Sequence, residues 1–414
     1  MVPMKATQAV SREPSPAPRP AAARSGAPPA VSPVEGRRDL RDFLALPHRL
    51  YADDPHYVPA LAIERRRHLD PRTNPYFQRA EACLWLARRE GRPVGRISAQ
   101  IDHEALSHRE DGSGHFGLLE AEDDREVFAS LLGTAESWLQ ARGVQRISGP
   151  FNLSINDECG LLVDGFDSPA MLMMPHGRPY YGDRLKEAGY TGVRDLLAYH
   201  VEVGASLPEA GIRLVRRVRE VSRVAVRPIQ WRRYEEEIAT IVDIFNDAWA
   251  DNWGFVPLSG ARLDHLARNL KPIVIDELVA IAEVDGQPAG MLVGLPNLNE
   301  ALADLGGRLL PLGWLKLLWR LKAGRIRTVR VPLMGVRRRY RGTLLGGALM
   351  VMMFERVRAA CYRRGIRAAE LSWVLEDNRA MRHVAEAMGS RVYKRYRLYE
   401  KALAQGGGAR DSAG

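Results

Sequence analysis

Residues 331–350 combine an apolar strand, an arginine-rich and glycine-rich turn, and the start of a small-residue helix, VPLMGVRRRYRGTLLGGALM. Backbone N–H groups at the start of a helix are unpaired, and the helix dipole favours an anion there. Glycines let phosphate oxygens approach these groups, and arginines add charge-assisted hydrogen bonds. The arginines are Arg337, Arg338, Arg339 and Arg341. This segment therefore predicts a pyrophosphate site.

The same turn resembles the acyl-CoA-binding motif of the GNAT acyltransferases, Arg/Gln-x-x-Gly-x-Gly/Ala, with Arg339, Gly342 and Leu344 at its three fixed places. Leu344 is bulky where the family usually has Gly or Ala, and Gly346 falls where a further family glycine often lies. The resemblance implies acyl-CoA as co-substrate. The residues that it implies for donor binding are Val336, Arg339, Arg341, Gly342, Gly346, Gly347 and Asn378.

A second segment that resembles a GNAT motif lies at the end of the apolar strand expected at 368–378 and beyond it. Asn378 and Gly389 resemble the family's Asn-x-x-Ala…Gly-Phe region that lines the CoA arm, and Asn378 also suits a helix N-cap. Ala385 lies where many members have a tyrosine thought to protonate the departing thiolate. We therefore expect the general acid to be absent or to come from elsewhere.

Residues 149–181, GPFNLSINDECGLLVDGFDSPAMLMMPHGRPYY, hold a dense set of polar side chains. An amine must lose a proton to attack a thioester, and a buried carboxylate with a raised pKa, or a histidine, can accept it. The expected bases are Asp157, Glu158 and His176. The expected acceptor contacts are Asn152, Asn156, Tyr180 and Tyr181. The alternative is an Asx-turn loop that leads into an apolar core run at 171–174.

Glu376 competes for the role of base, because it ends the central strand of the second half, where GNAT bases often lie beside the strands that admit acyl-CoA. Glu370 is a weaker alternative. An exposed acid that balances neighbouring arginines is the other interpretation of both residues. We expect Glu370 to be such an exposed acid.

The chain contains two copies of one unit. Residues 81–102 and 277–295 each predict strand, tight turn and strand, and Gly91 and Gly286 mark the two turns 195 residues apart. Helices expected over 124–142 and 347–364 follow, and 185–203 then parallels 384–402. This order of elements is also the GNAT order. The resemblance therefore implies an α/β fold of two tandem GNAT-like domains, with mixed central sheets flanked by helices.

The repeat gives domain limits. We expect an N-terminal domain over 37–203 on the acceptor side, a linker over 204–230, and a C-terminal domain over 231–403 that holds acyl-CoA. In the first half, residues 112–127 are acidic where the second half is basic. Acids at a helix start cap it well but repel a pyrophosphate. We therefore expect one acyl-CoA site, in the second half.

Composition sets further limits. A chain of 414 residues, 46% of them hydrophobic, suffices for two cores. Residues 1–36 are rich in Pro, Ala, Ser and Arg and predict a disordered tail, and 404–414 predict a flexible one. Cys83, Cys159 and Cys361 are far apart and form no metal-ligand spacing. We therefore expect reduced thiols, a cytoplasmic protein and no metal.

The net charge of +10 is concentrated in one window, since residues 304–341 carry eleven Lys or Arg against one acid. Within it, residues 309–322, LLPLGWLKLLWRLK, predict a basic amphipathic helix with two tryptophans. It is too short to span a bilayer and is typical of helices at a membrane interface, where anionic headgroups attract basic residues. The alternative is a helix that packs between the two halves.

These features favour an acyl-CoA-dependent N-acyltransferase that transfers an acyl group directly to an amine. The double unit with its NLSINDECGLLVDGFD segment is similar to bacterial GNAT-type proteins that include ceramide synthases, which implies a long-chain amino alcohol such as sphinganine as acceptor. From the amphipathic helix at 309–322 we expect a peripheral place at the inner membrane. Two alternatives stay open: a Fem-type aminoacyl transferase, and a degenerate GNAT protein that binds anionic lipid or nucleic acid. For the favoured function we expect no nucleic-acid partner.

Overall fold

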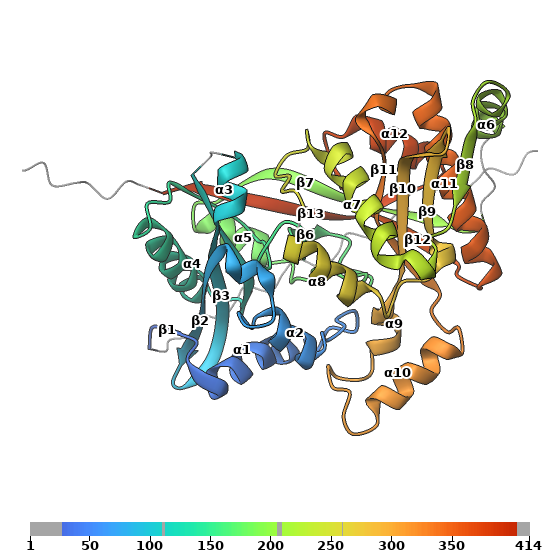
Figure 1. Cartoon of the computed structure of the whole chain (residues 1–414). Coiled ribbons are helices and arrows are strands. Elements are labelled where there is room, and N and C mark those ends of the chain that lie inside the picture. Colours follow the sequence, from blue (N-terminus) through green and yellow to red (C-terminus); the bar gives the residue numbers. More distant parts are fainter. Residues whose placement is uncertain (1–26, 110–111, 205–208, 259, 404–414) are drawn as a thin grey trace, which may run out of the picture.

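The computed structural model describes residues 27–109, 112–204, 209–258 and 260–403, and its strands form one continuous sheet (Figure 1). The order across the sheet is β1-β2-β3-β4-β5-β13-β7-β12-β11-β10-β9-β8, and β6 pairs with β13. The strands of the first half are β1 (Ala30–Pro33), β2 (Ala80–Arg89), β3 (Arg92–Asp102), β4 (Ser113–Ala121), β5 (Arg146–Gly149), β6 (Leu161–Asp164) and β7 (Thr191–Glu202). Those of the second half are β8 (Val224–Arg227), β9 (Val279–Val284), β10 (Gln287–Pro296), β11 (Thr328–Val336), β12 (Ala368–Leu375) and β13 (Arg391–Ala402).

Helices cover both faces of this sheet. In the first half they are α1 (Gly36–Leu50), α2 (Ala62–His68), α3 (His103–Arg109), α4 (Arg125–Gln140) and α5 (Tyr181–Glu187). In the second half they are α6 (Glu209–Val221), α7 (Tyr234–Trp249), α8 (Gly260–Leu270), α9 (Leu298–Leu302), α10 (Gly313–Lys322), α11 (Leu344–Arg363) and α12 (Arg379–Ala387). Short 3-10 turns lie at Pro75–Gln78, Trp231–Arg233, Asp276–Leu278 and Arg338–Tyr340. None of the helices among the described residues is long and apolar enough to cross a membrane.

Alternation along the strands explains the two layers of helices. In β9, Ala280 and Ala282 belong to the core under α11, whereas Val279 and Ile281 belong to the core under α7. Successive side chains of a strand point to opposite faces, so a run of apolar residues is buried on both. The helix α11 therefore covers one face of the second half, and α7 covers the other.

The predicted repeat is confirmed by the two hairpins. The turn between β2 and β3 holds Glu90 and Gly91 at φ of 52° and 78°, and the turn between β9 and β10 holds Asp285 and Gly286 at 51° and 75°. Two successive residues with positive φ match the right-handed twist of a hairpin. The same turn chemistry therefore starts both halves of the fold.

The last strand of each half pairs with the other half, which the sequence does not predict. The strand β13 is the last strand of the second half and pairs with β5 of the first, while β7 is the last strand of the first half and pairs with β12 of the second. These two strands also pair with each other along most of their length (Figure 1). The two halves are therefore joined through a shared sheet.

Two expected boundaries need correction. Residues 30–33 form β1, which pairs with β2, and α1 begins at Gly36, so the tail predicted over 1–36 extends too far. The predicted linker over 204–230 contains α6 and β8, and β8 pairs with β9 as the edge strand of the second half. Residues 1–26 and the tail over 404–414 lie outside the described residues.

Candidate active site

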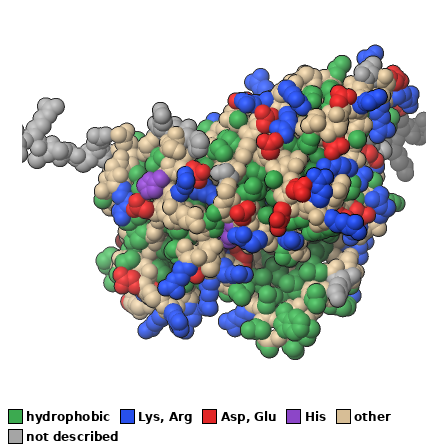
Figure 2. Space-filling model, in the orientation of Figure 1, with side chains coloured by type: hydrophobic (Ala, Val, Ile, Leu, Met, Phe, Trp, Pro, Cys, Tyr) green, Lys and Arg blue, Asp and Glu red, His purple; other side chains and the backbone are tan. Residues whose placement is uncertain are grey.

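A cavity of about 960 Å³ lies between the two halves and is lined by both. The first half contributes α1, α2, the end of β4 and the 152–158 and 170–176 segments, and the second half contributes α7, α8, α9, β10, β11 and β12. Five predicted site residues line it: Asn152, Asn156, Asp157, Glu158 and His176. The volume is in the upper range of small-molecule sites. Figure 2 shows the hollow with basic side chains around it.

The central strands of the second half part beside this cavity. The parallel pairing of β11 with β12 joins Thr328–Val331 to Ala368–Leu371, and both strands continue beyond it. The residues that follow the last pair, Pro332 and Leu333 on one strand and Ser372 and Trp373 on the other, line the cavity. This opening is where the GNAT resemblance places the acyl-CoA arm.

The glycine turn lies at the end of β11. Gly342 has φ of +73°, in the left-handed region that glycine adopts readily. Thr343 is the N-cap of α11, and its hydroxyl accepts a 3.0 Å hydrogen bond from the Gly346 N–H. The amides of Leu344 and Leu345 begin the helix and have no partner within it. Leu344 is 66% exposed, so its side chain points to solvent and does not fill the turn.

The arginines of this turn differ in their partners. Arg337 pairs with Asp243, Arg338 pairs with Asp247 and Asp251, and Arg341 pairs with Asp251 and with the Ala248 carbonyl. Among the described residues, Arg339 has no ion pair and stacks over the Tyr340 ring at 4.7 Å. Arg341 thus fastens the turn to α7, whereas no carboxylate among the described residues neutralises Arg339.

Gly346 is required by packing. A Cβ atom there would lie 2.1 Å from the Tyr340 carbonyl oxygen, which is backbone and cannot move aside alone. We expect Gly346→Ala to lower the free energy of unfolding by about 1–3 kcal/mol, measured by urea denaturation. Gly347→Ala is the control, because its nearest neighbour would be the Leu214 side chain at 3.5 Å. Equal effects of the two substitutions would contradict this.

In the first half, the region that corresponds to the glycine turn and the parted strands is occupied by side chains and backbone of the protein. The Asp124 carboxylate caps α4 and pairs with Arg89 at 2.6 Å, as the acidic sequence predicts. Where β4 parts from β5, the Leu118 N–H donates to Asn152 Oδ1 at 2.8 Å, and the Phe151 carbonyl lies so near Gly117 that any Cβ would clash. The Asn152 side chain therefore closes an opening in the sheet.

His176 and Asp54 form a partly buried pair at the edge of the cavity. His176 Nε2 lies 2.9 Å from Asp54 Oδ2, and His176 Nδ1 is buried without a hydrogen-bond partner among the described residues. The carboxylate fixes the proton on Nε2 and leaves a lone pair on Nδ1. Burial lowers the pKa of His176, although Asp54 opposes the shift. The imidazole is therefore neutral at pH 7 and able to accept a proton.

Glu120, at the end of β4, is a second candidate base that the sequence analysis missed. Its Oε2 accepts hydrogen bonds from the Tyr51 and Tyr181 hydroxyls, each at 2.7 Å, and the side chain lines the cavity. Burial raises the pKa of Glu120, against the opposing effects of Arg96 and the two hydroxyls. It has the raised pKa that we expect of a general base. A single acid within the apolar strand 113–121 is the signal that could have revealed it.

The predicted acids Asp157 and Glu158 have other partners. The Glu158 carboxylate pairs with Arg65 and accepts from Asn152 Nδ2 at 2.8 Å. Burial alone would raise the pKa of Glu158, but the Arg65 guanidinium outweighs it and the pKa is lowered. Asp157 Oδ2 accepts from the Ser154 amide and hydroxyl at 3.1 and 2.7 Å, so it holds the loop. Both acids face the cavity, but each already has partners within the protein and holds structure there.

Several expected contacts lie elsewhere. Glu376 accepts from the Asp195 N–H at 3.0 Å and is not among the described residues that line the cavity. Tyr180 donates to the Ala121 carbonyl at 2.7 Å, and Tyr181 donates to Glu120, so these tyrosines hold the end of β4 and do not line the cavity. Asn378 caps α12 by accepting from the Met381 N–H at 3.0 Å.

Glu370 corrects an expectation. It was expected to be exposed, yet it is fully buried and accepts hydrogen bonds from Ser372 and Tyr393. Arg330 Nε donates to the Ser372 hydroxyl at 2.8 Å, and Arg330 Nη1 donates to the Leu172 carbonyl at 3.0 Å. This network of buried charges fastens the 170–176 segment, and with it His176, to the parting strands.

The predicted amphipathic helix forms as α10 and lies at the surface. Exposed apolar side chains of α10 and of the residues just before it gather on one lobe below the hollow (Figure 2). They are Leu310, Leu312, Trp314, Leu315, Leu318, Trp319 and Leu321. Lys316 and Arg320 pair with Asp304, and Arg320 also donates to the Ala301 carbonyl of α9 at 2.8 Å. This apolar exposure does not fit a helix packed between the halves.

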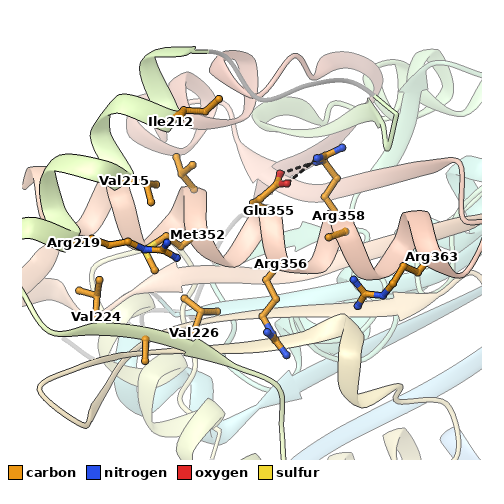
Figure 3. A pocket seen from close by; sticks show the side chains of 13 residues that line it. Ile212, Val215, Arg219, Val224, Val226, Met352, Glu355, Arg356, Arg358 and Arg363 are labelled. Atoms are coloured by element: carbon orange, nitrogen blue, oxygen red, sulfur yellow. Dashed lines mark hydrogen bonds and ion pairs between the residues drawn. The ribbon is translucent and has the colours of Figure 1, made fainter.

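A second, open groove of about 720 Å³ lies between α6, β8 and α11 (Figure 3). Its floor is aliphatic, and its charged residues are Arg219, Arg356, Arg358, Arg363 and Glu355. The carboxylate of Glu355 pairs with Arg358 at 2.7 Å. None of the predicted site residues lines this groove. Those of the predicted bases that line a cavity, Asp157, Glu158 and His176, therefore line the large one.

Metal chemistry has no evident site in the described part of the chain, where no cluster of three or more His, Cys, Asp or Glu side chains could hold an ion. The cysteines are free thiols, with Cys159 and Cys361 buried.

Comparison with solved structures shows the fold. A tandem GNAT protein from the clavulanic acid biosynthesis pathway superposes with a TM-score of 0.53 at 15% identity and covers 91% of this chain and 99% of that one. A second match is a GCN5-related glucosamine N-acetyltransferase region in a fungal multi-domain β-N-acetylglucosaminidase, with a TM-score of 0.54 at 15% identity. The superposition covers 90% of this chain and 38% of that protein. The tandem GNAT fold is thereby confirmed.

Sequence comparison shows the family, although no family model matches the chain. The chain is 48% identical over 375 residues to the bacterial ceramide synthase of Caulobacter vibrioides, covering 90% of this chain and 97% of that protein. It is 45% identical over 371 residues to the protein YghO of Escherichia coli, covering 89% and 94%. The chain is thus an N-acyltransferase with a tandem GNAT fold, and it belongs to the family of bacterial ceramide synthase and YghO.

Proposed function

We propose that the protein transfers an acyl group from acyl-CoA to the amine of a long-chain amino alcohol such as sphinganine. The observation that carries this proposal is a proton acceptor, His176, in a cavity that also touches the parted strands β11 and β12. The amine nitrogen attacks the thioester carbonyl, the C–N bond forms and the C–S bond breaks. The amine proton passes to the base, and CoA leaves as the thiolate.

We propose that the donor binds at the glycine turn. The free amides that begin α11 and the unpaired guanidinium of Arg339 suit a pyrophosphate. In the first half the same position holds Asp124 and Glu126. This difference supports a single acyl-CoA site, with the first half on the acceptor side.

His176, the proposed base, belongs to a segment that is fastened to β11, one of the two strands between which we propose the donor enters. Arg330, on β11, holds the Met173 carbonyl at 3.2 Å, and His176 follows Met173 by three residues. Three residues span at most about 11 Å. Ala385, on α12, carries a methyl group where many GNAT proteins have the tyrosine hydroxyl, so the proton must come from another residue. We propose that protonated His176 returns its proton to the departing thiolate.

A thiol-release assay tests the proposed function. Purified protein is incubated with acetyl-CoA or palmitoyl-CoA and with a panel of amines that includes sphinganine, and free thiol is followed. We expect release only when a long-chain donor and a long-chain amino alcohol are both present. Absence of release with every pair would refute the proposal.

The cavity also favours a lipid acceptor taken at a membrane surface. Leu298 and Leu302 of α9 line it, and α10, with its exposed apolar side chains, packs on α9. A short amphipathic helix with basic neighbours binds in the interface of an anionic bilayer. We propose that α10 holds the protein peripherally at such a surface.

Vesicle flotation tests this anchor. Replacing Leu310, Trp314 and Trp319 together with serine is expected to lower binding to phosphatidylglycerol vesicles more than about tenfold, because each side chain stabilises insertion by roughly 1.5–3 kcal/mol. The control is Trp231→Ser, which removes an apolar side chain 42% exposed on the 3-10 turn Trp231–Arg233. Flotation that is equal for the two proteins would exclude α10 as the anchor.

A further inference from the structure

One arm of the cavity is aromatic and aliphatic and is built by the second half. Phe245 and Trp249 of α7 lie with ring centroids 5.1 Å apart, and Phe255 lies 5.6 Å from Phe245. Leu270, Ile273 and Leu333 complete this wall. We call these six residues the aromatic arm. All six line the cavity, and three of them are aromatic.

The aromatic arm begins at the parted strands. Leu333 is two residues beyond the last paired residue of β11, Val331. Two residues further on, Gly335 lies against Trp249, whose ring would be 2.7 Å from a Cβ atom there. An alkyl group that emerges between β11 and β12 therefore meets this apolar wall directly.

The charged side chains that the second half brings to this cavity are paired. Arg330, on β11, donates to the Ser372 hydroxyl and the Leu172 carbonyl and lies 3.9 Å from Glu370. His176, Glu120 and Arg65 belong to the first half, and the charged residue that α8 brings to the cavity, Arg262, pairs with Asp102 at 3.1 Å and with Glu104 at 3.4 Å. Burying an unpaired charge beside an alkyl chain is unfavourable. The ion pairs of Arg262 remove that penalty from the wall of the arm.

We propose that the aromatic arm binds the acyl chain of a long-chain acyl-CoA and sets the chain-length preference of the enzyme. This inference rests on the proposed function, since it assigns one end of the same site to the donor. The acceptor amine is then left to the polar end, beside His176. Each buried methylene contributes roughly a fourfold gain in affinity, so the arm discriminates strongly between short and long donors.

Shortening the arm tests this assignment. We expect Ile273→Trp to lower kcat/KM for palmitoyl-CoA about tenfold or more relative to hexanoyl-CoA. Leu270→Trp fills the arm from a second position and is expected to shift the same ratio. If one of the two variants fails to fold, the other still tests the assignment. The control is Leu263→Trp, on α8 and in the same core but not lining the cavity. A ratio of the two donors is insensitive to the fraction of folded enzyme.

Tryptophan fluorescence gives a readout without turnover. Palmitoyl-CoA is expected to change the emission of the protein, acetyl-CoA is not, and Trp249→Phe is expected to remove most of the change. Acyl transfer with an unaltered chain-length ratio in both arm variants would overturn the proposal for the arm. Absence of transfer with every donor would instead refute the proposed function, and the Trp249 signal would still report chain binding.

Discussion

Replacing His176 with glutamine is expected to lower kcat/KM for amide formation by about 100-fold to 10,000-fold, the range that a general base contributes. Glutamine keeps a polar side chain of similar size but has no lone pair that can accept a proton at neutral pH. His176 lines the cavity, and its Nδ1 has no partner among the described residues. Initial rates with palmitoyl-CoA and sphinganine provide the measurement.

The pH dependence of the activity identifies the group that accepts the amine proton. His176 has a pKa below its ordinary value of 6.5, so it is neutral at pH 7 and activity is lost as the pH falls through that lowered pKa. The groups that act on it are Asp54, Arg178 and Lys394, with the Tyr51 and Tyr57 rings packed against it. We expect the acid limb to lie below pH 6.5 and to disappear in His176→Gln.

Substitutions of two neighbouring acids, Asp54 and Glu120, distinguish a catalytic role of His176 from a structural one. Asp54→Asn is expected to lower kcat less than His176→Gln, because Asp54 orients the imidazole and does not itself take the proton. Glu120→Gln keeps the capacity to accept hydrogen bonds from Tyr51 and Tyr181 but cannot act as a base. If Glu120→Gln abolishes activity and His176→Gln retains it, Glu120 is the base and our assignment is wrong.

Reversing the charge of Arg339 is expected to weaken CoA binding by about 100-fold, because the change removes a charge-assisted hydrogen bond to phosphate and adds a repulsive carboxylate. Isothermal titration calorimetry with CoA measures this without catalysis. Arg339 is singled out because its neighbours in the turn are already paired with acids on or next to α7.

The matched pair Arg339→Gln and Arg338→Gln isolates the charge. Both remove one guanidinium from the same exposed turn, but Arg338 is paired with Asp247 and Asp251. We expect Arg339→Gln to weaken CoA binding about tenfold and Arg338→Gln to change it little. Unaltered CoA affinity in Arg339→Glu would show that the donor pyrophosphate lies elsewhere.

The sequence predicted the features that depend on local pattern. The hairpin glycines Gly91 and Gly286, the N-cap Asn378 and the turn at Gly342 each lie where the spacing indicates. Such elements follow from residue type over a few positions, because turns and caps require particular backbone angles. The site assignment drawn from the same turn remains a prediction.

Non-local features could not be predicted in this way. The exchange of β7 and β13 joins residues about 200 positions apart, such as Leu197 and Arg395, and no short pattern encodes it. The burial of Glu120 depends on Tyr51 and Tyr181, and the imidazole of His176 is oriented by Asp54, 122 residues earlier. The pKa of a group depends on such neighbours, so sequence favoured Glu158, which Arg65 holds ionised.

The most direct test of the central claim is mass spectrometry of the product formed from palmitoyl-CoA and sphinganine by the purified protein. We expect one new species, the N-acyl amide, in equal amount to the CoA released, and none of it with His176→Gln at the same time point. Release of CoA with free fatty acid as the product, or no reaction with the intact protein, would contradict direct transfer to the amine.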